Sequence, residues 1–460
     1  MAFELKKQWL ADLETPVSAF LKLLPLRPVF LLESVEGGEI LGRYSFIGLR
    51  PLLRLEVSAD HTLVVDGESR HRLSANPFSI LREVLQRLNG PSPDELPRFS
   101  GGLVGYVGYD MIRFIERLPD VAREAMPFPL AAFCLPSVIL AFDHLQRKIS
   151  LIGSLRERDD DGLIDRIQRL LESSVPSWPA QASSPPRPNR SREQFVKQVE
   201  RAKAYIAAGD IFQVVLSIRF EGETEAHPFQ VYRALRMINP SPYMYYLDFG
   251  AYQIVGSSPE SLVRLENGRA MLRPIAGTRP RGANAAADRQ LEAELLADEK
   301  ERAEHIMLVD LARNDLGRVA QPGTVRVPDF LTVERYSHVM HLVSSVEGQM
   351  PPGMDMIDLF KATFPAGTVT GAPKIRAMEI IEELEGERRG PYAGSVGYFG
   401  LNGNMDQAIT LRTILFAGGR YYIQAGAGIV ADSIPEREHE EILNKARALF
   451  RALEMVAEGL

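Results

Sequence analysis

Two pairs of glutamates are the side chains in this sequence best suited to bind a metal ion. Glu301 and Glu304 form one E-x-x-E pair, and Glu438 and Glu441 form a second pair. Residues three apart on a helix share one face. If the two pairs face each other across a cleft, the four carboxylates repel unless a cation lies among them. Such an all-oxygen set suits Mg²⁺, whereas the alternative is two solvated helix faces.

A second group of residues would hold an anionic substrate. Turns at 402–403 (Asn-Gly) and 418–419 (Gly-Gly) predict a three-stranded meander, in which Arg412 falls opposite Ala425. The guanidinium then lies beside the backbone of Gly426, Ala427 and Gly428. Glycines there let an anion approach the peptide N–H groups closely.

A helix is predicted directly after this meander. Ser433 with Glu436 fits a capping box, and Pro435 suits the first turn. On that helix Lys445 shares a face with Glu438 and Glu441. The arginine, the amides, the lysine and the carboxylates together predict a site for a small polyanionic acid bound to Mg²⁺. The alternative is a hairpin followed by a solvated charged helix.

His341 and Glu260 are the candidates for proton transfer. His341 lies in the β-type run HVMHLVSSVEG, where a histidine is most often a core residue. Its functional alternative is a general base near neutral pH. Glu260, in the run SSPES, would donate a proton to a leaving hydroxyl if burial raised its pKa. Both alternatives stay open at this point.

Two glycine-containing segments look like nucleotide-binding loops but lack the required spacing. Residues 99–110, FSGGLVGYVGYD, lack the strand–turn–helix context and predict close packing of strands instead. Residues 367–374, GTVTGAPK, lack the P-loop spacing and the Ser or Thr after the lysine. They predict a loop that feeds a helix, with Thr370 as its cap.

Length and composition exclude several classes of protein. The 460 residues exceed one simple core, so two domains or one large composite are expected. The net charge of −7 argues against nucleic acid as a partner. No apolar run is long enough to span a bilayer, and the first residues lack a secretory hydrophobic region. Cys134 is the only cysteine, which excludes an intrachain disulfide. We therefore expect a cytoplasmic protein without a membrane partner.

The pattern of the chain divides it into three parts. Residues 1–171 are β-rich, residues 172–190 form a linker rich in Pro, Ser and Ala, and residues 191–455 form the main domain. Trp178 would hold the linker against a domain surface. The main domain begins with a helix from Ser191 to Gly209, then a strand with Gln213, and later a long helix over residues 285–316. Strands and helices do not alternate regularly, which argues against a doubly wound parallel sheet.

Several segments together resemble the chorismate-utilising enzymes, and most closely the family of large synthase subunits of anthranilate synthase (component I). The resemblance covers most of residues 191–453, and LLES and NPSPYM extend it to the regulatory parts. The matching segments are PIAGTRPRG, DEKERAEHIMLVDLARNDLGRV, HVMHLVSSVEG, FPAGTVTGAPKIRAMEII, GSVGYFG, DQAITLRT and QAGAGIVADS.

The resemblance implies a role for each matching residue. Glu304 and Glu441 would bind Mg²⁺ directly, and Glu301 and Glu438 would support it through water. The residues that would contact chorismate are Gly277, Thr278, Tyr398, Arg412, Gly426, Ala427, Gly428 and Lys445.

The resemblance also implies catalytic and regulatory residues. Glu260 resembles the acid that assists loss of the ring hydroxyl, and His341 resembles the group tied to the later elimination. Gln213 and Thr278 belong to the same catalytic set. The residues that would bind tryptophan as an inhibitor are Ser34, Pro242, Tyr243 and Met244.

The fold and reaction implied by the resemblance are specific. The fold would be α+β, with antiparallel β-sheets in a sandwich-like core, helices outside, and interlocked N- and C-terminal parts. Residues 1–171 would be the regulatory part and 191–455 the catalytic domain. The reaction would convert chorismate and ammonia to anthranilate and pyruvate, the first committed step of tryptophan biosynthesis. Ammonia would come from a separate glutaminase subunit (component II) or from solution, because the chain has no glutaminase segment.

Alternative activities differ at two positions. Aminodeoxychorismate synthases carry a nucleophilic lysine where this chain has Ala276, and isochorismate and salicylate synthases carry a lysine base at Gln213. Aminodeoxyisochorismate synthases share much of the pattern but stop before pyruvate loss. An alternative of another class is a non-catalytic tryptophan sensor that binds through Ser34 and Tyr243.

Overall fold

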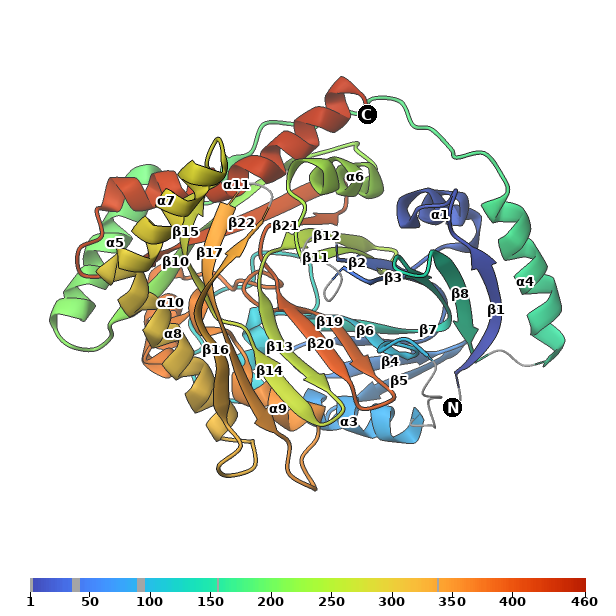
Figure 1. Cartoon of the computed structure of the whole chain (residues 1–460), viewed down its shortest axis with the longest axis horizontal. Helices are drawn as coiled ribbons and strands as arrows, with labels where there is room; N and C mark the ends of the chain where they lie inside the picture. Colours follow the sequence, from blue (N-terminus) through green and yellow to red (C-terminus); the bar gives the residue numbers. More distant parts are fainter. Residues whose placement is uncertain (1–2, 35–41, 89–95, 155–156, 337–338) are drawn as a thin grey trace.

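Figure 1 shows antiparallel strands at the centre of the molecule and helices on the outside. The computed structural model describes residues 3–34, 42–88, 96–154, 157–336 and 339–460. Within these ranges the named strands form one hydrogen-bonded network, and their pairings are antiparallel. The predicted α+β class is therefore confirmed.

The described residues of the N-terminal part form many strands and the helices α1, α3 and α4. Short 3-10 helices follow α1 and β6, namely η1 (Leu24–Leu26) and η2 (Tyr109–Phe114). Its other elements are β1 (Glu4–Leu10), α1 (Pro16–Lys22), β2 (Phe30–Glu33), β3 (Tyr44–Val57), β4 (Thr62–Asp66), β5 (Ser69–Leu73), α3 (Pro77–Leu88), β6 (Gly102–Val107), β7 (Ala131–Asp143), β8 (Lys148–Gly153) and α4 (Glu157–Leu171).

The remainder of the chain supplies the other strands and most of the helices. None of the described helices is both long and apolar enough to cross a membrane. The elements up to β17 are β9 (Arg187–Pro188), α5 (Arg192–Ala207), β10 (Gln213–Glu223), α6 (Pro228–Ile238), β11 (Tyr243–Asp248), β12 (Tyr252–Ser258), β13 (Ser261–Glu266), β14 (Arg269–Leu272), β15 (Ile275–Pro280), α7 (Ala285–Ala297), α8 (Glu299–Gly317), β16 (Arg326–Arg335) and β17 (Val339–Gln349). After them come α9 (Met356–Thr363), η3 (Gly367–Val369), β18 (Gly371–Ala372), α10 (Lys374–Glu385), β19 (Ser395–Gly400), β20 (Met405–Ile409), β21 (Thr413–Ala417), β22 (Arg420–Ile429) and α11 (Pro435–Glu458).

Strands from the two ends of the chain interlock. β2 pairs with β11, and β6 pairs with β19, so N-terminal strands lie beside C-terminal ones in the same network. Two large apolar clusters stabilise this arrangement. Phe30 belongs to one cluster, which also contains side chains of α3 and α9. Its neighbour Leu31 belongs to the other cluster, which lies beneath α1, α5, α6 and α11. Successive side chains of a strand point to opposite faces, so a continuous apolar run is buried on both faces.

The glycine-rich segment 99–110 packs tightly within the sheet, as predicted. It contains β6, whose residues are all buried between β7 and β19. A Cβ atom added at Gly105 would lie only 1.9 Å from the backbone oxygen of Ala132 on β7. The segment is therefore a site of close strand contact and not a nucleotide-binding loop.

The long helix predicted over residues 285–316 is instead two helices. α7 ends at Ala297 and α8 begins at Glu299, with Asp298 between them in an extended conformation. The Asp298 carboxylate accepts hydrogen bonds from the backbone N–H groups of Lys300 and Glu301, so it caps α8. The prediction missed this cap because the helical pattern continues on both sides of it.

The predicted three-stranded meander is wrong at its centre. The turn at 402–403 joins β19 to β20 and the turn at 418–419 joins β21 to β22, as expected. However, β20 pairs with β13 and β21 pairs with β12, so two separate hairpins form. The chain changes direction between them at Arg412, which has a φ of 46°. Arg412 therefore lies just before β21 and not within a strand.

Two predicted helix caps are also wrong. α11 begins at Pro435 after Ile434, and the Ser433 hydroxyl accepts a hydrogen bond from the Val430 N–H instead. Pro435 does occupy the first turn, as predicted. α10 begins at Lys374 without a side-chain cap, because Pro373 occupies the N-cap position; the Thr370 hydroxyl donates to the carbonyl of Ala366 instead.

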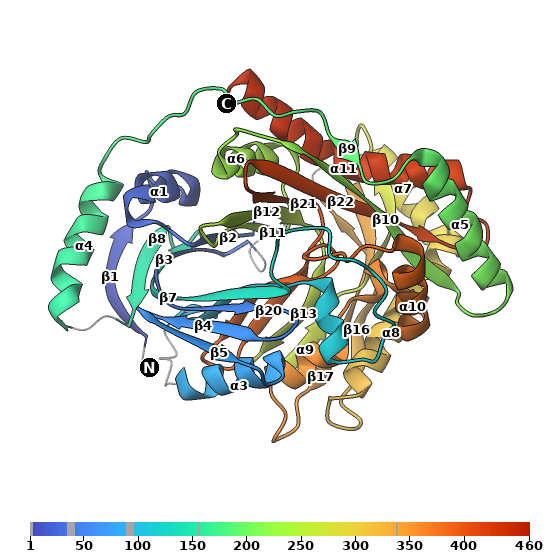
Figure 2. The same cartoon turned by 180° about the vertical axis from the view of Figure 1, so that it is seen from behind.

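The segment 172–190 runs in extended form along the outside of the molecule, and Figure 2 shows it passing close to α11. The Gln181 N–H donates to the Val456 carbonyl at 3.3 Å. The ring of Trp178 stacks on His227 with 4.9 Å between the ring centroids. The segment thus lies against the main domain, and the proposed domain boundaries remain a prediction.

Candidate functional site

Helices α8 and α11 bring the two E-x-x-E pairs within electrostatic reach of each other. Burial and then the charge of Glu301 raise the pKa of Glu304 on α8, and Glu441 on α11 adds to this effect. Burial raises the pKa of Glu438, again with a contribution from Glu441. Because charges act strongly on one another only at short range, the four carboxylates share one region.

These carboxylates fit Mg²⁺ by donor type, although they do not surround a metal position. Across the described part of the chain, no three His, Cys, Asp or Glu side chains are close enough together to hold one ion. Burial raises the pKa of Glu304 first, and repulsion from Glu301 and Glu441 adds to it; a divalent cation would relieve that repulsion. The assignment of Glu304 and Glu441 as the residues that would hold Mg²⁺, with Glu301 and Glu438 in support, stays a prediction.

Beside these carboxylates, residues 426–428 of β22 have one edge that no strand of the described residues pairs with. β22 pairs with β10 as far as Ile429, but with β21 only as far as Ile423. The Lys445 ammonium on α11 donates to the Gly426 carbonyl at 3.0 Å and lies 2.7 Å from the Glu441 carboxylate. An open strand edge with a lysine beside it suits a carboxylate ligand.

His341 lies in β17, as expected, and hydrogen bonds to residues of β15 hold its ring in place. Nδ1 lies 3.1 Å from the Gly277 carbonyl and 3.1 Å from the Thr278 hydroxyl. A carbonyl oxygen only accepts, so Nδ1 donates to it and Nε2 keeps a lone pair. Burial lowers the pKa of His341, and the charge of Arg412 lowers it further. The structure thus favours the neutral imidazole, the form that can act as a base.

Glu260, between β12 and β13, has the burial that its proposed role requires. Burial raises the pKa of Glu260 to about 7, against the opposing effects of a Thr368 hydrogen bond and the Lys445 charge. The Thr368 hydroxyl donates to the Glu260 carboxylate at 2.9 Å. Glu260 and Thr368 also line a cavity whose far wall is α8. A carboxyl with this pKa exchanges protons near neutral pH.

Gln213 and Gly277 lie close to the carboxylates. Nε2 of Gln213 donates to Glu304 at 3.4 Å, and a Cβ atom added at Gly428 would lie 2.7 Å from the same nitrogen. Gly277 has a φ of +66°, and a Cβ atom there would lie 3.3 Å from a Glu301 oxygen. Both glycines therefore leave room beside the predicted metal ligands.

Tyr398 lies with the predicted tryptophan-binding residues, apart from the other predicted chorismate contacts. It lines a cavity that contains Ser34, Pro242, Tyr243 and Met244. A different tyrosine, which the sequence analysis missed, reaches the glycine stretch. A Cβ atom added at Gly426 would lie 2.6 Å from the hydroxyl oxygen of Tyr392.

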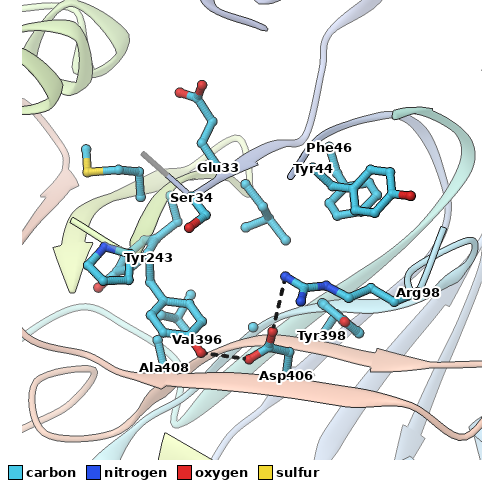
Figure 3. Close-up of a pocket in the computed structure, with 15 residues that line it drawn as sticks. Glu33, Ser34, Tyr44, Phe46, Arg98, Tyr243, Val396, Tyr398, Asp406 and Ala408 are labelled. Carbon is cyan, nitrogen blue, oxygen red and sulfur yellow. Dashed lines mark hydrogen bonds and ion pairs between the residues drawn. The ribbon is translucent and has the colours of Figure 1, made fainter. Parts of the chain in front are cut away.

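The cavity around Ser34 contains a pair of opposite charges, and Figure 3 shows both pointing into it. The Arg98 guanidinium lies 3.7 Å from the Asp406 carboxylate, which also accepts a hydrogen bond from the Tyr243 hydroxyl at 3.0 Å. Tyr44 and Tyr398 add aromatic walls. Sequence reasoning missed Arg98, since no motif surrounds it, whereas Asp406 opens the recognised segment DQAITLRT.

Comparisons with known proteins find relatives over nearly the whole chain. The family described as chorismate binding enzyme matches residues 27–451. "Anthranilate synthase component 1" of Acetivibrio thermocellus is 49% identical, covering 97% of this chain and 94% of the relative. The protein of the same name from Thermus thermophilus is 50% identical, covering 99% and 98%.

Solved structures agree as well. The crystal structure of anthranilate synthase component I from Streptococcus pneumoniae superposes with a TM-score of 0.81 at 37% identity, covering 97% of this chain and 100% of that chain. The menaquinone-specific isochorismate synthase of Escherichia coli superposes with a TM-score of 0.76 at 22% identity, covering 98% and 95%, which shows a shared fold. The chain therefore belongs to the family of chorismate binding enzymes.

Proposed function

We propose that this protein is the synthase subunit of a Mg²⁺-dependent anthranilate synthase, a lyase that converts chorismate and ammonia to anthranilate, pyruvate and water. The observation that carries the proposal is the carboxyl of Glu260, whose burial raises its pKa to about 7 beside the charge of Lys445. A neutral carboxylic acid next to a cation suits a reaction that must protonate a hydroxyl on an anionic substrate. The names of the curated relatives support the same activity.

Binding of chorismate would use the cations and the open strand edge. Arg412 and Lys445 pair with the two carboxylates of the substrate, and the backbone at 426–428 approaches it closely because Gly426 and Gly428 have no side chain. Mg²⁺, when bound by Glu304 and Glu441, would supply charge neutralisation and orientation of a substrate carboxylate.

In the first step ammonia forms a bond to C2 as the C4 hydroxyl leaves. Hydroxide is a poor leaving group, so Glu260 transfers its proton to that oxygen, which leaves as water. A positioned acid of this kind typically accelerates a reaction by ~10²–10⁴-fold. The ammonium group formed at C2 loses one proton to solvent and becomes the C2 amine.

In the second step the C2 proton and the enolpyruvyl group leave, and the ring becomes aromatic. His341 Nε2 accepts the C2 proton, because the hydrogen bond from Nδ1 to the Gly277 carbonyl fixes the required tautomer. The ether electrons leave with the enolpyruvyl oxygen, which becomes pyruvate after protonation at carbon.

Two absent lysines argue against the rival products. Ala276 offers no amine to attack the ring, which argues against transfer of the substituent to C4. Gln213 cannot deprotonate water, and its amide donates to Glu304 instead. Ammonia needs no such activation, so amination at C2 is favoured over hydroxylation.

Ammonia would come from a separate glutaminase subunit in the cytoplasm. Cys134 is the only cysteine, it is buried, and burial raises its thiol pKa to about 12. A thiol in that state is not a nucleophile for glutamine hydrolysis. Ammonium at high concentration would replace the partner in vitro.

The cavity around Ser34 would bind tryptophan as a feedback inhibitor. An amino acid carries both charges at neutral pH, and the cavity offers a cation in Arg98 and an anion in Asp406. The Arg98 Nε has no hydrogen-bond partner within the described residues, so the guanidinium has a free donor for a carboxylate. Tyr44 and Tyr398 provide faces for an indole ring.

Product analysis tests the proposal. The protein is incubated with chorismate, Mg²⁺ and ammonium, and the products are separated by liquid chromatography. Anthranilate with equimolar pyruvate is expected. Isochorismate, a 4-amino product or an amine that retains its pyruvyl group would overturn the proposal. No turnover of chorismate would favour the tryptophan sensor.

The His341→Ala variant tests the second step separately. Loss of the base should slow elimination more than amination, so an amino-dihydro intermediate with its pyruvyl group should accumulate. Normal anthranilate output from this variant would remove His341 from the mechanism while leaving the overall reaction intact.

A further inference from the structure

Arg389, four residues after the end of α10, is a charged side chain that the mechanism above does not use. Its guanidinium lies 2.6 Å from the Glu385 carboxylate, and the two side chains are 1% and 2% exposed. Burying such a pair is expensive, and it often adds little net stability compared with apolar residues of similar size. The contacts of the pair therefore call for another explanation.

The pair joins three segments of the main domain. Arg389 donates to the Val369 carbonyl of η3 at 2.8 Å and to the Val215 carbonyl of β10 at 2.7 Å. Glu385 accepts from the backbone N–H and the hydroxyl of Ser217, both at 2.8 Å. Arg389 and Glu385 thus fix the spacing between η3, β10 and the last turn of α10.

Two of these segments, η3 and β10, carry a group of the candidate site. Thr368, next to Val369, donates to the Glu260 carboxylate at 2.9 Å. Gln213, two residues before Val215, donates to Glu304. A shift of η3 or of the start of β10 would therefore move the partner of the acid or the partner of a predicted metal ligand.

The Arg389 guanidinium also lies against two tyrosine rings. It is 4.8 Å from the centroid of Tyr109 and 5.6 Å from that of Tyr392. The Tyr392 hydroxyl reaches the backbone at Gly426, where a Cβ atom would lie 2.6 Å from it. One buried cation therefore touches elements on both the acid side and the substrate side of the site.

We propose that Arg389, held in place by Glu385, is a positioning residue that fixes η3 so that the Thr368 hydroxyl meets the Glu260 carboxyl, and that fixes Tyr392 against the glycine stretch of β22. This inference rests on the proposed function, because it concerns the acid of that reaction. Arg389 itself touches no predicted substrate atom and acts only through these neighbours.

The proposal predicts a change in the pH dependence of turnover. The Thr368 hydrogen bond stabilises the charged form of Glu260, so loss of that bond raises the pKa of the acid. The other charged groups near Glu260 are Lys445 on α11, together with Asp315 and Arg273 across the shared cavity. None of these three has a hydrogen bond to Arg389 in the described structure.

The test compares Arg389→Met with Arg388→Met by measuring kcat against pH at constant free ammonia. Arg388 is the matched control, because its guanidinium pairs with the exposed residues Asp120 and Glu124. Arg389→Met should lower kcat at neutral pH by about tenfold or more, as expected for a displaced catalytic group. It should also shift the fall of kcat at alkaline pH to a pH about one unit higher, as expected when a hydrogen bond to a charged group is lost. Arg388→Met should change neither quantity.

Two further variants keep the test decisive if Arg389→Met does not fold. Arg389→Met combined with Glu385→Met removes both buried charges, and Arg389→Lys retains the charge opposite Glu385. In the double variant kcat should fall at the same higher pH as in Arg389→Met. In Arg389→Lys it should fall at a pH between those of wild type and Arg389→Met. The inference is overturned if any folded variant without the guanidinium shows the same fall of kcat at alkaline pH as wild type. Failure of the wild-type protein to make anthranilate would instead overturn the proposed function.

Discussion

The hydrogen bond between Thr368 and Glu260 gives a sharp prediction for the Thr368→Val variant. The valine keeps the shape of the side chain but removes the hydroxyl that donates to the carboxylate at 2.9 Å. That bond lowers the pKa of Glu260, which burial otherwise raises to about 7. Without the bond the carboxyl should stay protonated to a higher pH.

The size of the shift follows from the strength of the bond. A hydrogen bond to a charged group contributes about 1.5–3 kcal/mol, and one pKa unit corresponds to about 1.4 kcal/mol. The pKa of Glu260 should therefore rise from about 7 by roughly one to two units. At pH 8 the protonated fraction would then grow from about one tenth to about one half or more, so the variant should keep more of its maximal rate there than wild type.

Anthranilate fluorescence measures this change directly. Total ammonium is adjusted at each pH so that free ammonia stays constant, because the nucleophile also titrates. Thr363→Val is the matched control, since Thr363 lines the same cavity but donates to the backbone oxygens of Leu359 and Phe360. If the alkaline limb of folded Thr368→Val coincides with that of wild type, Glu260 is not the acid that limits turnover.

Three other predictions concern stability, metal dependence and inhibition. Burial raises the pKa of Glu260 in the folded protein to about 7. The contribution of this carboxyl to the free energy of unfolding is therefore complete below the ordinary glutamate pKa and is lost as the pH rises through about 7. Glu260→Gln should therefore increase the free energy of unfolding, measured in urea, by up to about 3 kcal/mol more at pH 8 than at pH 5, and an equal effect at both values would contradict the assigned burial. Glu441→Gln should raise the Mg²⁺ concentration for half-maximal activity by about tenfold or more, and full activity at limiting Mg²⁺ would exclude Glu441 as a ligand. Ser34→Arg should abolish inhibition by tryptophan with little change in uninhibited turnover, whereas unchanged inhibition would remove Ser34 from the inhibitor site.

Local patterns in the sequence predicted several site elements correctly. The spacing of Glu441 and Lys445 fixes their ion pair, because residues four apart on a helix are neighbours. The strand positions of Gln213 and His341 followed from β-type runs on either side of them. In each case the information lies within one element and needs no knowledge of its partners.

Properties that arise between distant elements could not be predicted. The burial of Glu260 depends on η3 and α11, more than 100 residues further along the chain. Arg98 and Asp406 meet only because β6 pairs with β19 and β19 with β20. Tyr392 and Tyr398 are six residues apart, and only the sheet assigns one to the glycine stretch and the other to the second cavity.

The strand pairings also place the cavity around Ser34 within a few residues of the one that contains Glu260. Tyr243, in the proposed tryptophan cavity, lies opposite Ser258 in the β11–β12 ladder, two residues before Glu260. The Ile409 N–H donates to the Glu260 carbonyl, and Arg412 follows only three residues later. A ligand acts at a distance only by binding one of two conformations more tightly than the other. A tryptophan that bound only when β11 and β20 were displaced would therefore act on strands that neighbour the proposed acid Glu260 and the proposed substrate-binding Arg412. Inhibition would then require no long chain of contacts, because the proposed regulatory and catalytic residues lie on paired or adjoining segments of backbone.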